Sequence, residues 1–162
     1  MNEPAVDSKH AETDLHLGRL AGSLGFLLRM AQLEGFDSLR SEIGTKGLKP
    51  GEFSVMWLVG KYPAVRQGNV AQSLRIKKAH MTKLVRSIEE QGYLTREIPE
   101  DNRRSVLLTL TPLGQSIVEQ RSSDFFDNFF AESRNLNKED VNTLVALLQK
   151  FTGIKGGTQN EL

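Results

Sequence analysis

GNVAQSLRIKKAHMTKLVRSIEEQGYLTREIPEDNRRSVLLTLTPLG, residues 68–114, is the stretch from which the fold is most clearly predicted. Apolar residues within it recur at i, i+3, i+4 and i+7, which predicts an amphipathic helix over 79–91. These residues are Met81, Leu84, Val85 and Ile88. A shorter helix is predicted over 69–74, with a tight turn before the longer one. This order of elements is typical of a helix–turn–helix.

The side of helix 79–91 opposite these apolar residues is mostly basic and rich in hydrogen-bonding groups. It presents Ala79, Lys83, Arg86 and Glu90, flanked by His80, Thr82 and Ser87. Arg75, Lys77 and Lys78 crowd the start of the helix, where the macrodipole disfavours cations. Phosphate oxygens would reverse that penalty, because they attract both the cations and the free backbone donors of the first turn. A solvated basic face is the simpler alternative, but the crowding favours contact with DNA.

Residues 94–111 predict a β-hairpin, because apolar and polar residues alternate on both sides of a polar tip at 99–104. The tip carries the adjacent Arg103 and Arg104, which suit a neighbouring minor groove or a phosphate. A surface hairpin can also carry two arginines without such a role. The dipeptide Thr111-Pro112 predicts the N-cap and first turn of another helix.

Outside this stretch the sequence predicts further helices. Recurring leucines predict one over 13–36, Pro50 opens a second, and Asn137 caps a last helix that ends at Phe151. The fold class is therefore mainly α with a small β-hairpin wing (α+β). We expect Phe125, Phe126, Phe129 and Phe130 to lie in a dimer core.

Composition argues against several classes of protein. The chain is 38% hydrophobic and 25% charged, as in soluble globular proteins. It has no cysteine, and its three histidines lack ligand spacing, so we expect no disulfide, no metal and no cofactor. No catalytic motif is present, and no signal peptide or membrane span, so we expect a cytoplasmic protein that is not an enzyme and has no membrane partner. Net charge is only +1, so the case for DNA rests on where the charges lie.

Residues 68–114 resemble the MarR family of winged helix–turn–helix transcription regulators. The resemblance implies a homodimer in which the first helix and the last two intertwine. Two winged helix–turn–helix lobes would then be held over a pseudo-palindromic operator in double-stranded DNA. We expect a single domain over 13–151, between a disordered N-terminus (1–12) and a frayed tail (152–162). Within this domain, residues 50–111 form the winged helix–turn–helix, and residues 13–49 and 112–151 form the dimerisation helices.

By this resemblance a set of residues faces DNA. They are Gln67, Asn69, Lys77, Lys78, Ala79, His80, Thr82, Lys83 and Arg86, with Arg103 and Arg104 at the wing tip. Two positions depart from the family pattern. Asn102 stands where many relatives have an acidic residue, so which arginine enters the groove is open, and we favour Arg104. Arg75 occupies a turn position where glycine is common, so we expect strain or a different turn geometry there, and an added phosphate contact.

Residues 27–39 resemble family members that sense aromatic carboxylates or their coenzyme A thioesters. Arg29 and Arg40 could meet an anionic group of such an effector. An apolar wall would be formed by Phe36, Phe53, Met56 and Trp57. The alternative is that these aromatic residues are core and the arginines lie at the surface or in dimer salt bridges. The predicted function is a sequence-specific repressor released by a small aromatic effector; an effector-independent DNA-binding or architectural protein is the alternative.

Overall fold

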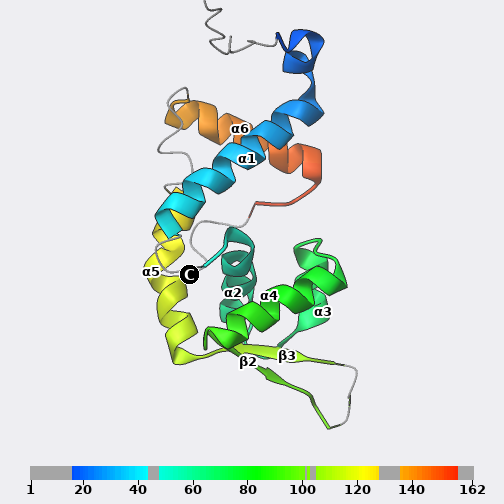
Figure 1. Cartoon of the computed structure of the whole chain (residues 1–162), viewed down its shortest axis with the longest axis vertical. Helices are drawn as coiled ribbons and strands as arrows, with labels where there is room; N and C mark the ends of the chain where they lie inside the picture. Colours follow the sequence, from blue (N-terminus) through cyan, green and yellow to red (C-terminus); the bar gives the residue numbers. More distant parts are fainter. Residues whose placement is uncertain (1–15, 44–47, 101, 103–104, 128–135, 157–162) are drawn as a thin grey trace, which may run out of the picture. The chain divides into compact units, whose positions relative to one another are not determined.

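The structure is a computed structural model that describes residues 16–43, 48–100, 102, 105–127 and 136–156 (Figure 1). It divides into two compact units, Met1–Glu34 and Gly35–Leu162. The elements are η1 (Gly18–Gly22, a 3-10 helix), α1 (Leu24–Ile43), α2 (Pro50–Lys61), β1 (Val65–Arg66), α3 (Gln67–Ser73), α4 (Lys78–Glu90), β2 (Leu94–Glu97), β3 (Leu107–Leu110), α5 (Pro112–Asp127) and α6 (Lys138–Thr152). Within the described ranges, none of the helices combines the length and apolar character needed to cross a membrane.

One hydrophobic core joins α2, α3, α4, the sheet and the first half of α5. Helix α2 contacts α4, α5 and β3, and Figure 1 shows the strands passing beneath α2 and α4. The core comprises Leu48, Phe53, Val55, Met56, Val59, Val70, Met81, Leu84, Val85, Ile88, Leu94, Leu108, Ile117 and Val118. All four apolar residues predicted for the inner side of α4 belong to it, so the predicted helix and its orientation are confirmed.

Three antiparallel strands form a small sheet in the order β1-β3-β2. Leu94 pairs with Leu110 across the hairpin, which confirms the predicted wing strands. Strand β1 was not predicted from the sequence. Val65 and Arg66 pair with β3, and the N–H of Gln67 donates to the carbonyl of Val106 at 2.8 Å. A two-residue strand has no periodicity of its own, so only its partner defines it.

The junction between the wing and α5 depends on two residues, Thr111 and Gly114. The hydroxyl of Thr111 accepts a hydrogen bond from the N–H of Gly114 at 3.1 Å, which confirms the predicted N-cap. That hydroxyl also donates to the carbonyl of Gly92 at 2.7 Å, and the N–H of Thr111 donates to the carbonyl of Tyr93 at 3.0 Å. A Cβ on Gly114 would lie 1.9 Å from the carbonyl oxygen of Tyr93, so only glycine fits there.

The prediction of one helix over 13–36 is wrong. Where the chain is described, the 3-10 helix η1 ends at Gly22, Ser23 has extended dihedral angles (φ −81°, ψ 118°), and α1 then continues to Ile43. Glycine costs about 1 kcal/mol relative to alanine inside a helix, which explains a break beside Gly22. The last helix matches its prediction: the side chain of Asn137 accepts from the N–H groups of Glu139 and Asp140, and α6 ends one residue after Phe151.

We predict that Gly114→Ala lowers the free energy of unfolding by about 1–3 kcal/mol, the usual cost of forcing extra volume into a packed site. The methyl group would displace the backbone of Tyr93 and loosen the base of the wing. Urea unfolding at fixed protein concentration measures the effect. Gly68→Ala is the matched control, because a Cβ at that helical position meets nothing within 4 Å. Equal stability of the two variants would contradict the close approach.

Candidate nucleic-acid interface

The outer side of α4 is exposed along its whole length. Of the predicted DNA-facing residues, those on this helix are all exposed: Lys78, Ala79, His80, Thr82, Lys83 and Arg86. The apolar residues on the opposite side are buried, so this face points outward whenever the lobe is folded. The hydroxyl of Thr82 donates to the carbonyl of Lys78 at 3.0 Å, so its oxygen stays available as an acceptor.

The first turn of α4 has free backbone donors and no acid to neutralise its positive end. Lys77 stands at the N-cap, where its side chain makes no capping hydrogen bond, and the first turn holds no acidic residue. The first N–H groups of any helix lack an intrahelical acceptor, and they carry the positive end of the macrodipole. With Lys77 and Lys78 exposed beside them, the site is chemically suited to a phosphate.

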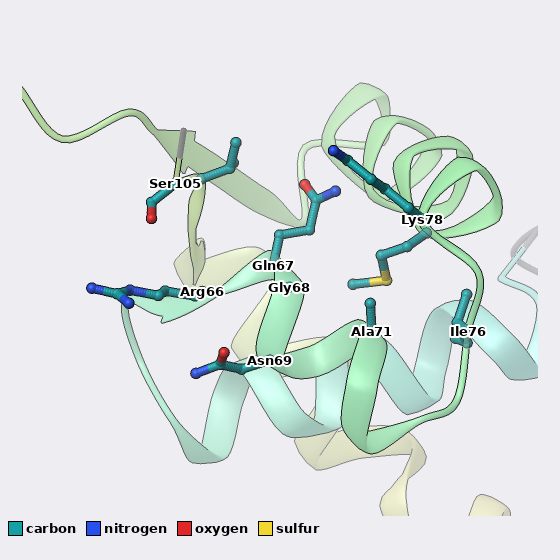
Figure 2. Close-up of a pocket in the computed structure, with 10 residues that line it drawn as sticks. Arg66, Gln67, Gly68, Asn69, Ala71, Ile76, Lys78 and Ser105 are labelled. Atoms are coloured by element: carbon teal, nitrogen blue, oxygen red, sulfur yellow. The ribbon is translucent and has the colours of Figure 1, made fainter. Parts of the chain in front are cut away.

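A hollow of about 430 Å³ lies between α3, the start of α4 and the residues that precede β3. Figure 2 shows Lys78 on one side of it, Arg66 and Asn69 on the other, and Gln67 between them. The floor includes Ala71, Ile76 and Met81. The fold therefore gathers three of the predicted residues, Gln67, Asn69 and Lys78, around one opening. Arg66 was missed; its only signal in the sequence was a cation directly before the short helix.

Arg75, in the turn between α3 and α4, has the left-handed backbone that its sequence position suggested. Its φ is +53°, a conformation that costs a non-glycine residue about 1–2 kcal/mol. The strain expected at this residue is therefore present. Its Nη2 donates to the carbonyl oxygen of Thr152, at the end of α6, at 3.3 Å. The contact of Arg75 with a phosphate stays a prediction.

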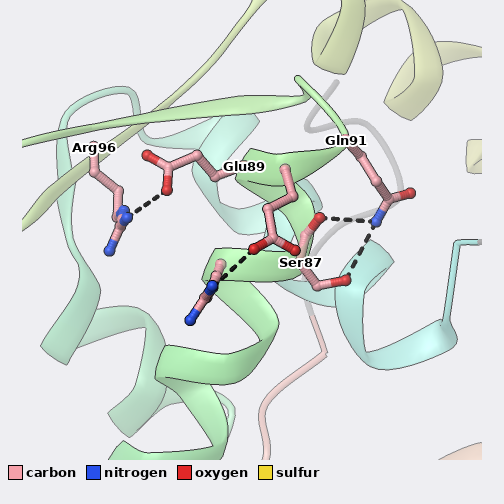
Figure 3. A network of polar contacts seen from close by, with 6 residues as sticks. Ser87, Glu89, Gln91 and Arg96 are labelled. Atoms are coloured by element: carbon pink, nitrogen blue, oxygen red, sulfur yellow. Dashed lines mark hydrogen bonds and ion pairs between the residues drawn. The ribbon is translucent and has the colours of Figure 1, made fainter.

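Two ion pairs connect the charged residues of α4. The Nε of Arg86 donates to the Oε1 of Glu90 at 2.8 Å, one helical turn along. Figure 3 shows the second pair, between Glu89 on α4 and Arg96 on β2, which joins the wing to the helix. The hydrogen bond to Glu89 raises the pKa of Arg96 above its ordinary value, against a small opposing effect of burial. This pair was not predicted from the sequence.

At the end of α4 a further bond supports the turn into the wing. The side-chain amide of Gln91 donates to the backbone carbonyl of Ser87 at 3.0 Å (Figure 3). At the other end of the hairpin, Arg103 and Arg104 lie outside the described residues. Their predicted contact with a groove is therefore untested, whereas the base of the wing that carries them is well defined.

Only part of the predicted effector site is described. Phe53 and Met56 are fully buried in the lobe core, and Trp57 is half-buried beside them. The side chains of Phe36 and Arg40 lie outside the described residues, and Arg29 belongs to the other compact unit. The structure thus places three of the six residues together, on α2.

These α2 residues meet two phenylalanines of α5 in an aromatic cluster, which we define as Phe53, Trp57, Phe125 and Phe126. Phe125 stacks on Phe53 with ring centroids 4.4 Å apart, so it contributes to the core of its own lobe. Phe126 meets Trp57 edge to face at 4.6 Å and is 51% exposed. Phe129 and Phe130, also expected in a dimer core, lie outside the described residues.

Comparison with known proteins identifies the winged helix–turn–helix region. Residues 48–106 match the model of the MarR family, which spans α2, the helix–turn–helix and the wing strand β2. A protein of Thauera aromatica, named as a candidate transcriptional regulatory protein for the hcr operon, is 28% identical over 142 residues, covering 83% of this chain and 81% of its own.

Solved structures show the same fold. The transcriptional repressor CouR, bound to a 23-mer DNA duplex, has a TM-score of 0.74 and 24% identity, covering 86% of this chain and 99% of its own. A second structure is that of BpsR of Bordetella bronchiseptica, whose DNA binding is regulated by 6-hydroxynicotinic acid. It has a TM-score of 0.73 and 24% identity, and the match covers 83% of this chain and 96% of BpsR. Residues 48–106 of this chain therefore match the MarR family model, and the chain has the fold of these solved regulators.

Proposed function

We propose that this protein is a DNA-binding transcription regulator of the MarR family, a sequence-specific repressor that acts in the cytoplasm as a homodimer. In this proposal each subunit presents α4 to a major groove of a pseudo-palindromic operator, and a small aromatic effector releases the protein from DNA. The observation that carries the proposal is the exposed cationic face of α4, held outward by its buried opposite side.

Contact with DNA would remove an electrostatic cost that the free protein bears. Lys77 and Lys78 stand at the positive end of the α4 macrodipole, with no acid in the first turn. Phosphates would neutralise them and release condensed counterions, which drives association at low salt. Because the whole chain carries a net charge of only +1, this attraction would be local to the α4 face rather than general.

Exposed apolar residues outside the lobe core support a homodimer. At the N-cap of η1, on η1 and on α1 these are Leu17, Leu20, Leu24, Leu27, Met30 and Leu33. On and after α6 they are Val145, Leu147, Phe151 and Ile154. Large exposed apolar patches mark interaction surfaces on soluble proteins. The occupant that we propose is a second copy, because a two-fold dimer places two α4 helices on successive half-sites.

Effector binding is supported by the aromatic cluster and by one similar protein. The DNA binding of BpsR is regulated by 6-hydroxynicotinic acid, an aromatic acid. In this chain, Trp57 and the exposed ring of Phe126 form the accessible edge of the aromatic cluster. We propose that an aromatic acid, or its coenzyme A thioester, stacks on this edge.

An effector-independent DNA-binding or architectural protein is the remaining alternative. Such a protein would use the same cations but show little preference between sequences. Competition between a duplex selected from a randomised library and a scrambled duplex of equal composition separates the two functions, because specific binding survives moderate salt and an excess of competitor.

We predict that Lys83→Ala weakens binding to the selected duplex by about 1–3 kcal/mol if Lys83 contacts a base edge. Fluorescence anisotropy at several salt concentrations measures the change. Lys138→Ala is the matched control, since it removes one exposed lysine at the start of α6. If neither Lys83→Ala nor Arg86→Ala changes the affinity, the α4 face is not the recognition surface.

For the dimer, we predict that Leu147→Asp combined with Phe151→Asp gives a folded monomer in sedimentation. These side chains are 59% and 67% exposed in the single chain, so a second copy could bury them. Each buried apolar side chain contributes about 1.5–3 kcal/mol, and the substitutions would remove that stabilisation from both subunits. Gln72→Asp with Ser73→Asp adds the same charge to exposed residues of α3, away from α6, and should leave the dimer intact. A dimer that survives the first pair of substitutions would exclude this face as the interface.

The effector can be tested through Trp57, the only tryptophan of the chain. We predict that 6-hydroxynicotinic acid, benzoic acids or their coenzyme A thioesters raise the melting temperature, quench Trp57 fluorescence and lower the affinity for the selected duplex. By linkage, DNA must lower the affinity for the effector by the same factor. Cyclohexanecarboxylic acid is the control, since it has the charge without the aromatic ring. A screen without any hit would favour the effector-independent alternative.

A further inference from the structure

The outward face of α4 carries one carboxylate that is not engaged with the wing. Glu90 holds the Nε–H of Arg86 at 2.8 Å, and the two side chains are 62% and 74% exposed. The neighbouring acid, Glu89, binds Arg96 of β2 instead. Among the described residues of α4, Glu90 is therefore the acid on the face that the proposed function presents to DNA.

The presence of an acid at position 90 is not explained by the stability of α4. Glu90 is the last residue of α4, where the macrodipole disfavours negative charge. Its pair with Arg86 runs from cation to acid along the helix, the weaker of the two orders. An exposed ion pair of this kind contributes little to the stability of the helix. A residue that opposes the local preferences of its helix commonly serves a function instead.

The ion pair changes what Arg86 can bind. It occupies the Nε–H and holds the planar guanidinium in one orientation, with the N–H groups of the two terminal nitrogens left for a ligand. Those groups match an edge with two adjacent acceptors, which guanine presents in the major groove through O6 and N7. A side chain held in place before binding also loses less rotamer entropy when it binds.

The charge of Glu90 opposes a contact between Arg86 and a DNA phosphate. A guanidinium that swings to a phosphate must either break its bond to Glu90 or bring the carboxylate toward the negatively charged backbone. Both cost free energy, and neither cost arises when Arg86 meets a base edge from its held position. Glu90 would therefore weaken binding to arbitrary sequences more than binding to the operator.

We propose that Glu90 is a specificity-determining residue of this regulator. It positions Arg86 for a guanine edge in the major groove and penalises the transfer of Arg86 to phosphates on other sequences. This inference rests on the proposed function in one respect, namely that α4 enters the groove.

The test compares Glu90→Gln with the unchanged protein on two duplexes, one selected from a randomised library by the unchanged protein and one scrambled. Removing the charge should raise affinity for the scrambled duplex about threefold to fivefold, the effect of one charge near a phosphate in a largely aqueous setting. The salt dependence on that duplex should steepen by about one unit, as expected for one added phosphate contact. On the selected duplex, the lost positioning offsets the lost repulsion, so affinity should change less than about twofold.

Two controls separate this role from a general charge effect. Glu119→Gln on α5 removes the same charge from an exposed residue outside the α4 face, and should leave the ratio of the two affinities unchanged. In an Arg86→Ala background, Glu90→Gln should no longer alter the ratio, because it acts through Arg86.

The outcomes that contradict the proposal are distinct. If Glu90→Gln raises both affinities equally, or has the same effect with and without Arg86, Glu90 is only a surface charge and the inference is overturned while the proposed function stands. If the unchanged protein enriches no sequence at all, the proposed function fails and this inference fails with it.

Discussion

The burial of one side of α4 is the interaction on which the rest of the molecule depends. Met81, Val85 and Ile88 have no exposed surface. Each buried aliphatic side chain contributes about 1.5–3 kcal/mol, so turning the helix about its axis would cost several such contributions. Lys83 and Arg86 therefore face outward because the core holds the other side inward. The surface that we propose to meet DNA is thus a consequence of apolar packing.

The wing is attached to α4 at two levels. At its base, Thr111 binds the backbone of the segment that leaves α4, and Gly114 packs directly on the carbonyl of Tyr93. Further out, Glu89 binds Arg96 on β2. A hairpin of two four-residue strands has little stability alone, so these contacts make α4 and the base of the wing one rigid body. A shift of the lobe would then move groove contact and wing contact together.

Elements that are specified by their own residues were predictable from the sequence. The period of α4 placed all four of its core residues, and the caps at Thr111 and Asn137 began their helices as expected. Elements specified by distant partners were not predictable. Strand β1 exists because β3 lies beside it, and the contribution of Arg66 follows from that pairing. The break at Ser23 was missed because the leucine period continues through the glycines that interrupt the helix.

The residues of the predicted effector site could not be assigned from the sequence for a different reason. A protein core and the wall of a pocket use the same aromatic side chains. Phe53 is fully buried and stacks on Phe125, whereas Phe126, the next residue along α5, is half exposed beside Trp57. A ligand that stacks on this edge would thus press on rings that are continuous with the lobe core. In the dimer that we propose, the spacing between the two α4 helices would be set by helices outside that core. A coupling of about 1–3 kcal/mol between the two sites is enough to change DNA affinity substantially, and the rings shared by α2 and α5 offer a direct physical route for it.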